Sequence, residues 1–385
     1  MFLLVLCGLP NAAARDRVRE NAAAAVASAA NKPETIYTLT LRDHSPMPVV
    51  SLHNAPGQGR SLEGCISFNP SFIPASPTFN MSGILLRLCC GKGCIGHGRS
   101  KSEVTAEAPA ERIGFAPCDV ETGLCSDVLA DFNLDPTADA EDPRAILYNG
   151  MYYNFYYRQA KGGGCTGPEC TVQLAKTATP LNASSWQAIG TFPWHRNGCC
   201  AMRPKGERSY CIWGEGPGPF QGLGISYTED IDSGIFVQDS WLVGPGVHSP
   251  LSNDSRWLLP LGGNQEEIKL EAGTHMVKLS TGDWVHFYAA ATPGWVENGN
   301  YTAGYLVLDK DDPRKILQRQ SGQWLVPFYD YETLCGGASD CPFTGERKNV
   351  IFLCSATPMQ AKDTFRLFFG GGDGNVGTAV VEVTY

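Results

Sequence analysis

Short alternating runs of apolar and polar residues fill the chain after about residue 60, and most end at Gly, Pro, Asn or Asp. Alternation with a period of two is typical of β-strands with one buried face, and the residues between the runs are turn formers. No amphipathic helix longer than three turns is predicted after residue 35. The clearest strands are "GILLRLCC", "RAILYNGMYYNFYYRQ", "TVQLAKTAT", "SYCIWGEG", "LGISYTED", "THMVKLSTGDWVHFYAAAT", "YTAGYLVLDK", "NVIFLCSAT" and "FRLFFGGGDGNVGTAVVEV".

A loose repeat groups these strands. A hairpin with an N-G, T-G or K-G turn leads into an aromatic strand, and a second strand follows after a loop. Copies begin near residues 147, 202, 277 and 350, and a fifth fits at about 65–115. Sheets repeated in this way predict an all-β, five-bladed β-propeller, with a β-sandwich as the alternative. We expect the aromatic strand to take the inner position of each blade, so that charged residues at its end converge on one axial pocket.

The N-terminal residues differ from the rest. The short apolar run in "MFLLVLCGLPNAAARDR" is followed by small residues, which is typical of a secretory signal peptide. An exposed tail or a truncated signal anchor is the alternative. We therefore predict a signal peptide over 1–14, a short irregular extension over 15–60 with one weak strand, and the propeller over 61–385.

Cysteines and sequons also favour the secretory pathway. Without Cys7, 14 of the 15 cysteines remain, which is the even number that a disulfide framework needs. Many lie close together, as local staples do, and no second C-x-x-C or H-x-x-x-H pair accompanies "CCGKGC", which argues against zinc. The N-x-S/T sequons are Asn80, Asn182, Asn253 and Asn300. We expect a secreted or luminal glycoprotein that needs no metal or other cofactor.

Charge narrows the set of partners. The net charge of −9 gives no basic footprint for nucleic acid, and no later run reaches the length of a membrane-spanning helix. The sequence also lacks a G-x-S-x-G elbow, an H-E-x-x-H motif, a P-loop and a dinucleotide fingerprint. What remains is carboxylates beside aromatic residues, a set typical of glycoside chemistry, in which one acid protonates the leaving oxygen and a second activates water.

The first candidate acid is Asp142 in "EDPRAILYNGMYYNFYY". Pro143 holds the preceding residue in an extended conformation, and Arg144 lies two residues further on the same strand face. The alternative is an ordinary charged turn. The triplet recurs as Asp312-Pro313-Arg314, where charges on all sides predict a solvated hairpin tip.

Other candidates lie at strand ends in other repeats. Glu215 is flanked by glycines in "IWGEG" after Trp213, which could stack on a sugar, and the alternative is a rim loop. Lys269 and Glu271 share one strand face, and their alternative is a surface ion pair. Asp373 lies in a glycine cluster, as a ligand contact or a turn residue.

Six ordered stretches resemble glycoside hydrolase family 130, the β-mannoside phosphorylases and β-mannosidases with a five-bladed propeller. The resemblance covers about residues 65–385 and rests on "FNPSF…GILLRL", "EDPRAILYNGMYYNFYY", "RNGCCAMRPKGERSYCIW", "IKLEAGTHMVKLSTGDWVHFYAAAT", "YTAGYLVLDKDDPRKILQR" and "NVIFLCSAT…FRLFFGGGDGNVGTAVVEV". It implies that Asp142 is the general acid, acting in the phosphorylases through a sugar hydroxyl. It also places residues around the sugar or phosphate, namely Arg87, Asn197, Arg203, Lys269 and Asp373.

Two departures from the family pattern bear on the activity. The chain has "IWGEG" where phosphorylases carry a basic residue, and Glu271 where they have glycine. Phosphate binding requires a cationic pocket, whereas these changes supply candidate bases. We therefore expect an inverting hydrolase of a β-mannoside-like glycan, with Glu215 or Glu271 as base. A phosphorylase using inorganic phosphate, another five-bladed glycosidase and a non-catalytic glycan-binding propeller are the alternatives.

Overall fold

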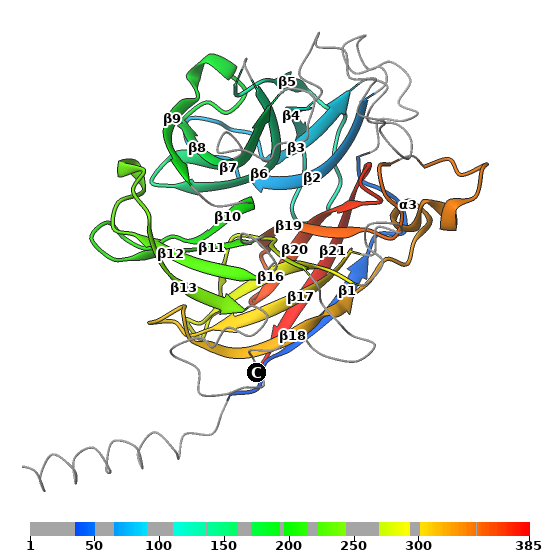
Figure 1. Ribbon diagram of the computed structural model, residues 1–385. Helices are drawn as coiled ribbons and strands as arrows, with labels where there is room; N and C mark the ends of the chain where they lie inside the picture. The colour runs from blue at the N-terminus through cyan, green and yellow to red at the C-terminus, as the bar shows by residue number, and fades with distance from the viewer. Residues whose placement is uncertain are drawn as a thin grey trace, which may run out of the picture. The chain divides into compact units, whose positions relative to one another are not determined.

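The computed structural model describes residues 35–50, 65–90, 111–135, 138–160, 171–192, 196–214, 222–243, 269–292, 301–343 and 345–385. The chain divides into two units, one of Met1–Thr38 with Tyr385 and one of Leu39–Thr384. The fold described below is that of the second unit. In Figure 1 its strands form five sheets around a common centre, which confirms the predicted five-bladed β-propeller.

Each sheet is one blade, and its neighbouring strands pair antiparallel. Blade I contains β2 (Cys65–Ile73), β3 (Gly83–Cys90), β4 (Glu111–Pro117) and β5 (Ala130–Phe132). Blade II contains β6 (Ala138–Tyr148), β7 (Met151–Ala160), β8 (Thr171–Thr177) and β9 (Gln187–Phe192). Blade III contains β10 (Arg196–Ala201), β11 (Ser209–Gly214), β12 (Leu223–Thr228) and β13 (Val237–Val243).

Blades IV and V complete the ring. Blade IV contains β14 (Lys269–Ala272), β15 (Val277–Lys278), β16 (Trp284–Ala291), β17 (Tyr301–Leu308) and β18 (Ile316–Leu325). Blade V contains β19 (Ile351–Pro358), β20 (Thr364–Gly371), β21 (Asn375–Thr384) and β1 (Thr38–His44). Within the described residues the helical segments are at most four residues long: η2 (Ala183–Ser185), η3 (Ile231–Ser233), α3 (Asp330–Thr333) and η5 (Leu334–Gly337).

The inner strand of each blade is the one that precedes the hairpin, not the aromatic strand. The first strands β2, β6, β10, β14 and β19 contact one another around the centre. The aromatic strands β7, β11, β16 and β20 take the second position, so our prediction of their place was wrong. Large rings are needed to fill the space between neighbouring sheets, and Tyr152 of β7, for example, packs against Phe79 and Phe115 of the preceding blade.

The core accordingly lies between the blades. Separate clusters of buried side chains fill the interfaces of blades I and II, II and III, III and IV, IV and V, and V and I. Polar bonds near the axis add to this packing. Ser71 Oγ accepts a hydrogen bond from the Ala145 amide (2.7 Å), and His275 Nδ1 accepts one from the Cys200 amide (2.8 Å). The inner strands are thereby held at fixed positions relative to one another.

The last blade is completed by the first described strand. Strand β1 pairs with β21, and Nη2 of Arg42 lies 2.7 Å from a carboxylate oxygen of Glu382. His44 at the end of β1 contacts the buried Glu332 of α3 at 2.5 Å. Residues 38–44 lie within the stretch predicted as an extension, so this weak strand contributes to the propeller.

Four disulfides are described: Cys65–Cys90, Cys118–Cys125, Cys200–Cys211 and Cys335–Cys341. Three of them join cysteines that lie close in sequence, as expected for local staples. Cys199 and Cys354, however, are free and buried, so not every cysteine after Cys7 belongs to the disulfide framework. Both thiols lie in inner strands beside Arg144, which acts on their pKa values.

Other predictions have mixed outcomes. The sequon residues Asn80 and Asn182 are exposed, whereas Asn253, Asn300 and the signal-peptide region lie outside the described residues. Among the helices of the described part, none has the length and apolar character required to cross a membrane.

Candidate active site

Bulges in the inner strands bring the polar side chains together. Strand pairing shifts register between Phe68 and Ser71 in β2, Glu141 and Arg144 in β6, and Arg196 and Cys199 in β10. Each bulge contains an Asn or Asp with positive φ: Asn69 (49°), Asp142 (51°) and Asn197 (57°). The extended conformation predicted for Asp142 from the following proline was therefore wrong. Asn and Asp tolerate this left-handed conformation better than other side chains with a Cβ, and such strained backbone clusters at functional sites.

Asp142 is almost completely buried and makes three polar contacts with neighbouring blades. Its Oδ1 accepts a hydrogen bond from Asn69 Nδ2 at 2.7 Å and lies 3.4 Å from Arg87 Nη1. Its Oδ2 accepts a bond from Arg196 Nη1 at 3.0 Å. Burial alone would raise the pKa of Asp142, but the charges of Arg87 and Arg196 outweigh it and lower the pKa to about 2.

Glu141, the preceding residue, shares these arginines. It lies 3.1 Å from Arg87 Nη2 and 3.5 Å from Arg196 Nη1. Arg87 also forms a bidentate pair with Glu111, with both N–O distances 2.8 Å. Burial raises the pKa of Glu141 to about 8 against the opposing charge of Arg87, and the nearby carboxylate of Glu111 adds to the rise. Neighbouring carboxyls therefore differ widely in their affinity for a proton.

Blade IV supplies a second acidic group. Glu271 Oε1 lies 2.6 Å from Lys269 Nζ and accepts a hydrogen bond from the hydroxyl of Tyr301 at 2.9 Å. Lys269 Nζ in turn donates to the Tyr301 hydroxyl oxygen at 3.1 Å. The other oxygen, Oε2, is buried and has no hydrogen-bond partner among the described residues. Lys269 and Glu271 are 5% and 2% exposed, so they do not form the surface ion pair considered above.

Arg144 interacts electrostatically with both acidic groups. It is fully buried and donates from Nε to the carbonyl oxygen of Gly273 at 2.6 Å. The pKa of Arg144 is raised despite its burial, and Asp142 and Glu271 are among the groups that raise it. Because its guanidinium is enclosed, we assign Arg144 a role in positioning the site and not in contact with substrate.

Two further candidates border the cluster. Asn197 is buried, and neither atom of its side-chain amide has a hydrogen-bond partner among the described residues. Asp373 has positive φ (45°) and lies 3.9 Å from Arg347. Burial raises the pKa of Asp373 to about 6 against the charges of Arg347 and Arg87. Asp142 and Glu271 also act on Asp373, which places these three carboxyls within electrostatic range of one another.

Other predicted site residues lie elsewhere or outside the described part. Arg203 donates to the carbonyl oxygens of Lys310 and Asp311 in a hairpin turn. Trp213 is buried in the core between blades II and III, so its ring is not available to a sugar. Glu215 lies outside the described residues. The preceding Gly214 packs on blade IV, where a Cβ would lie 2.6 Å from the Cα of Glu271.

The second Asp-Pro-Arg triplet is the hairpin turn that the sequence predicts. It connects β17 to β18, and Asp312 accepts hydrogen bonds from the backbone amide and the guanidinium of Arg314. The side chains of Asp312 and Arg314 are 34% and 27% exposed. The two triplets therefore share three letters but differ in burial and partners.

Sequence reasoning missed four residues of the cluster. Asn69, Glu141, Arg196 and Tyr301 contact the candidate acids or their partners. The recurring Asn-Pro, Asp-Pro and Asn-Gly pairs at 69, 142 and 197 were the available signal, since each pair marks a bulge in an inner strand.

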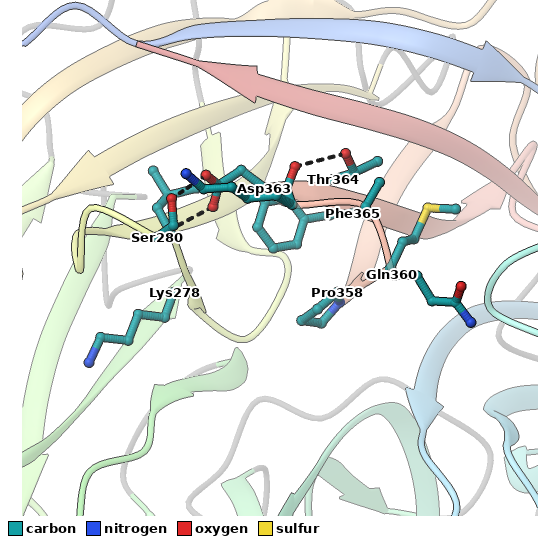
Figure 2. A pocket seen from close by; sticks show the side chains of 11 residues that line it. Lys278, Ser280, Pro358, Gln360, Asp363, Thr364 and Phe365 are labelled. Atoms are coloured by element: carbon teal, nitrogen blue, oxygen red, sulfur yellow. Dashed lines mark hydrogen bonds between the residues drawn. The ribbon is translucent and has the colours of Figure 1, made fainter.

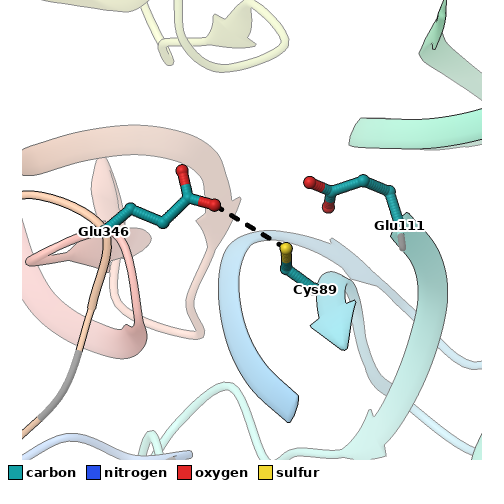
Figure 3. Close-up of side chains that lie close together, drawn as sticks. All are labelled: Cys89, Glu111 and Glu346. Atoms are coloured by element: carbon teal, nitrogen blue, oxygen red, sulfur yellow. Dashed lines mark hydrogen bonds between the residues drawn. The ribbon is translucent and has the colours of Figure 1, made fainter. Parts of the chain in front are cut away.

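Two other features do not extend the site. The groove in Figure 2 lies between the turn after β15 and the β19–β20 hairpin, where Asp363 accepts hydrogen bonds from Ser280, and no candidate site residue lines it. Figure 3 shows Cys89, Glu111 and Glu346 close together. Cys89 is disulfide-bonded and Glu111 pairs with Arg87, so this group lacks the thiolate that a metal would need.

Comparison with known proteins supports the resemblance. The family model described as beta-1,4-mannooligosaccharide phosphorylase matches residues 261–384. A 1,2-beta-oligomannan phosphorylase from Thermoanaerobacter sp. is 25% identical over 63% of this chain and 68% of its own length. A beta-1,2-mannobiose phosphorylase from the same organism is 33% identical over 38% of this chain, which spans 43% of that relative.

Solved structures share the fold. The beta-1,2-mannobiose phosphorylase of Listeria innocua superposes with a TM-score of 0.58 at 16% identity, covering 89% of this chain and 96% of its own. A structure from work on GH130 glycoside hydrolases that target beta-1,2 mannosidic linkages in Candida mannan also has a TM-score of 0.58, at 15% identity, covering 91% of this chain and 95% of that chain. The fold is a five-bladed β-propeller with a cluster of buried acids and arginines in its inner strands. Over residues 261–384 the chain is similar to the glycoside hydrolase family 130 model.

Proposed function

We propose that this chain hydrolyses a β-mannoside-like glycan with inversion, with Asp142 as the general acid. The family resemblance supports the substrate class, and the acids of blades II and IV that interact with Arg144 support the reaction type. Disulfides suit an oxidising compartment, in keeping with a secreted or luminal enzyme.

In this reaction the glycosidic bond breaks and both of its electrons leave with the oxygen, which takes a proton from the acid. Water attacks the anomeric carbon from the opposite face and loses a proton to the base. We assign the base to Glu271, whose buried Oε2 has no protein partner among the described residues. Glu215 is the alternative base. Arg87, Asn197 and Asp373 are the proposed contacts to the sugar.

The ion pair of Lys269 with Glu271 is the observation that favours water over phosphate as the attacking group. The two groups are 2.6 Å apart, so the lysine charge is balanced within the protein. A phosphate ion would approach a carboxylate at this position as well as an ammonium group. Coulomb repulsion between the two anions would oppose its binding.

A phosphate-dependent mannoside phosphorylase is the second candidate. It is favoured by the curated relatives, which are named as phosphorylases, and by the matching family model. In that reaction phosphate replaces water and the product is a sugar phosphate. Arg87, Arg196 and Lys269 are the cations that could then contribute to binding it.

One experiment tests the acid and the attacking group together. Wild type, Asp142→Asn and the matched control Asp312→Asn are assayed on β-manno-oligosaccharides with and without phosphate. We expect free sugar from the wild type in both conditions and a loss of about 10²- to 10⁴-fold in Asp142→Asn. Asn tolerates the left-handed backbone of residue 142, so circular dichroism should show an unchanged fold.

The control should retain wild-type turnover, because Asp312 lies in a partly exposed turn where ion pairs contribute little, about 0–1 kcal/mol. If a sugar phosphate forms, and only when phosphate is added, the chain is a phosphorylase and not a hydrolase. Equal turnover by Asp142→Asn and the wild type would remove Asp142 from the mechanism. Glycan binding without turnover would identify a non-catalytic propeller.

A further inference from the structure

Glu141 and Asp142 are consecutive residues whose side chains reach the same guanidinium. Successive residues of a regular strand point to opposite faces. The bulge in β6 and the positive φ of Asp142 change this arrangement. As a result Glu141 Oε2 and Asp142 Oδ2 lie 3.5 and 3.0 Å from the same atom, Arg196 Nη1.

The cations around this pair are shared with other acids, since Arg144 also acts on Asp142 but interacts with Glu271 as well. Arg87 directs Nε and Nη2 to the two oxygens of Glu111, so its charge is largely balanced by that bidentate pair. Glu141 receives only a shared contact from Arg87 Nη2 at 3.1 Å, and Asp142 a long one from Nη1 at 3.4 Å. Glu141 therefore only shares Arg87 and Arg196 with other carboxylates, whereas Asp142 has the charge of Arg144 as well. When two carboxyls share a site in this way, one of them retains a proton.

Asp142 has the better support as an anion. It is closer to Arg196 than Glu141 is, and the amide of Asn69 donates a further hydrogen bond to it at 2.7 Å. Glu141 has no comparable neutral donor among the described residues, and the carboxylate of Glu111 binds the same arginine. The proton is therefore expected on Glu141.

We propose that Glu141 and Asp142 form a carboxyl pair that holds a single proton in the resting enzyme, and that Glu141 is the residue on which this proton rests. The proposal rests on the proposed role of Asp142 as the acid facing the leaving group, and it makes Glu141 a positioning residue for the proton. When the glycosidic oxygen leaves with both bond electrons, the pair gives up its one proton to that oxygen. It regains a proton from solvent before the next turnover.

The groups facing Glu141 from each packed element agree with this assignment. Strand β3 contributes Arg87, β4 contributes Glu111, β10 contributes Arg196, and β19 contributes the Cys354 thiol. Arg144 of β6 itself and Asp373 after β20 interact with Asp142. Two further arginines of these strands pair elsewhere, Arg112 with Asp131 and Arg158 with Asp135. Asp139 accepts a hydrogen bond from the backbone amide of Glu111. The pKa values of the pair, raised to about 8 for Glu141 by burial and lowered to about 2 for Asp142, match the geometry.

The first test is the pH profile of kcat/KM on a β-manno-oligosaccharide. The wild type should lose activity as the pH rises through about 8, where the pair releases its proton. Glu141→Gln cannot hold this proton, so its activity at about pH 7 should fall at least about tenfold and recover toward acid pH. If kcat/KM falls at the same alkaline pH in Glu141→Gln as in the wild type, the proposal is overturned.

The second test needs no substrate, so it stands even if the proposed activity is wrong. The folded chain holds the Glu141 proton up to about pH 8, whereas an unfolded glutamate releases it near its ordinary value of 4.5. This contribution to stability is therefore lost as the pH rises between those values. The Tm of the wild type minus that of Glu141→Gln should fall from about pH 5 to about pH 8 and then level off. A difference that is constant or rises with pH contradicts the proposal.

Two further variants test whether Glu141 is the group that titrates. Glu141→Asp retains a titratable group, so it should retain an alkaline limb even if Glu141→Gln folds poorly. Glu111→Gln removes a negative neighbour and frees two donors of Arg87 for Glu141, so the alkaline limb should move to lower pH. If kcat/KM falls at the same alkaline pH in Glu111→Gln as in the wild type, the group that titrates there is not Glu141.

Discussion

A single guanidinium connects four blades at the axis. Arg144 belongs to blade II, donates to Gly273 in blade IV, lies 5.7 Å from the ring of Phe352 in blade V, and acts on the thiol of Cys199 in blade III. A fully buried cation is costly unless charges and carbonyl oxygens compensate it. Asp142 and Glu271 supply the charges, so Arg144 couples the two proposed catalytic groups to the frame of the propeller.

Replacement of Arg144 by lysine should show this coupling. Lysine keeps the charge but cannot direct planar donors to the carbonyl oxygens of both Pro143 and Gly273. We expect a loss of about 3 kcal/mol or more in the free energy of unfolding, measured by urea denaturation. Arg314→Lys in the exposed turn is the control and should cost about 1 kcal/mol or less. Equal effects at both positions would argue against a special role for Arg144.

At the scale of single residues, the sequence predicted part of the buried polar cluster. The placement of Asp142, Lys269, Glu271, Arg87 and Asn197 near the axis follows from the fold class, because inner strands of a propeller converge. Arg203 lies outside the cluster because it belongs to the connection between β10 and β11. Trp213 lies outside it because the face of a strand on which a residue lies depends on register, and a shift of one residue reverses it. Glu141 was overlooked because a regular strand would point it away from Asp142, and only the bulge brings them together.

At the scale of elements, the strands were predictable and their order within a blade was not. Alternation reveals a strand but does not tell which edge faces the axis. The aromatic residues of β7 and β16 suited an inner strand in our prediction, yet their rings fill the space between sheets. Small residues and bulges characterise the true inner strands, as in "FNPSF" of β2 and "RNGCCA" of β10.

The disulfides should contribute unequally, since they close loops of different length. Cys65–Cys90 spans 25 residues in sequence and Cys118–Cys125 spans 7. Loop entropy predicts that removing the longer link costs about 1 kcal/mol more than removing the shorter one. Unfolding of the two Cys→Ala double variants in urea measures the difference. A larger loss for the shorter link would indicate that native packing, and not loop entropy, decides the order.

At the scale of the whole propeller, one blade joins the two ends of the described fold. Strand β1 forms the outer edge of the blade that also contains β19, β20 and β21. Closure of the ring therefore depends on a strand of seven residues, together with contacts such as His44 to Glu332. Without it, β21 would expose unpaired backbone groups at a sheet edge.

Deletion of residues 1–44 should accordingly destabilise the propeller, with a fall in Tm of about 2 °C for each kcal/mol lost, and should promote self-association through β21. Thermal unfolding and size-exclusion chromatography measure the two effects. Deletion of residues 1–34 leaves β1 in place and serves as the control. If both truncated chains behave alike, β1 is not required for closure.

Two free thiols in the inner strands, those of Cys199 and Cys354, can report how often the propeller ring opens. Cys199 and Cys354 are fully buried, and burial raises the pKa of Cys199 to about 12, so a thiol reagent meets no reactive thiolate while the blades stay together. At reagent concentrations where labelling is faster than reclosing, the rate at which these two side chains become labelled, followed peptide by peptide in a mass spectrometer, is the rate at which the inner strands separate. The chain carries this reporter in its natural sequence, with no engineered probe.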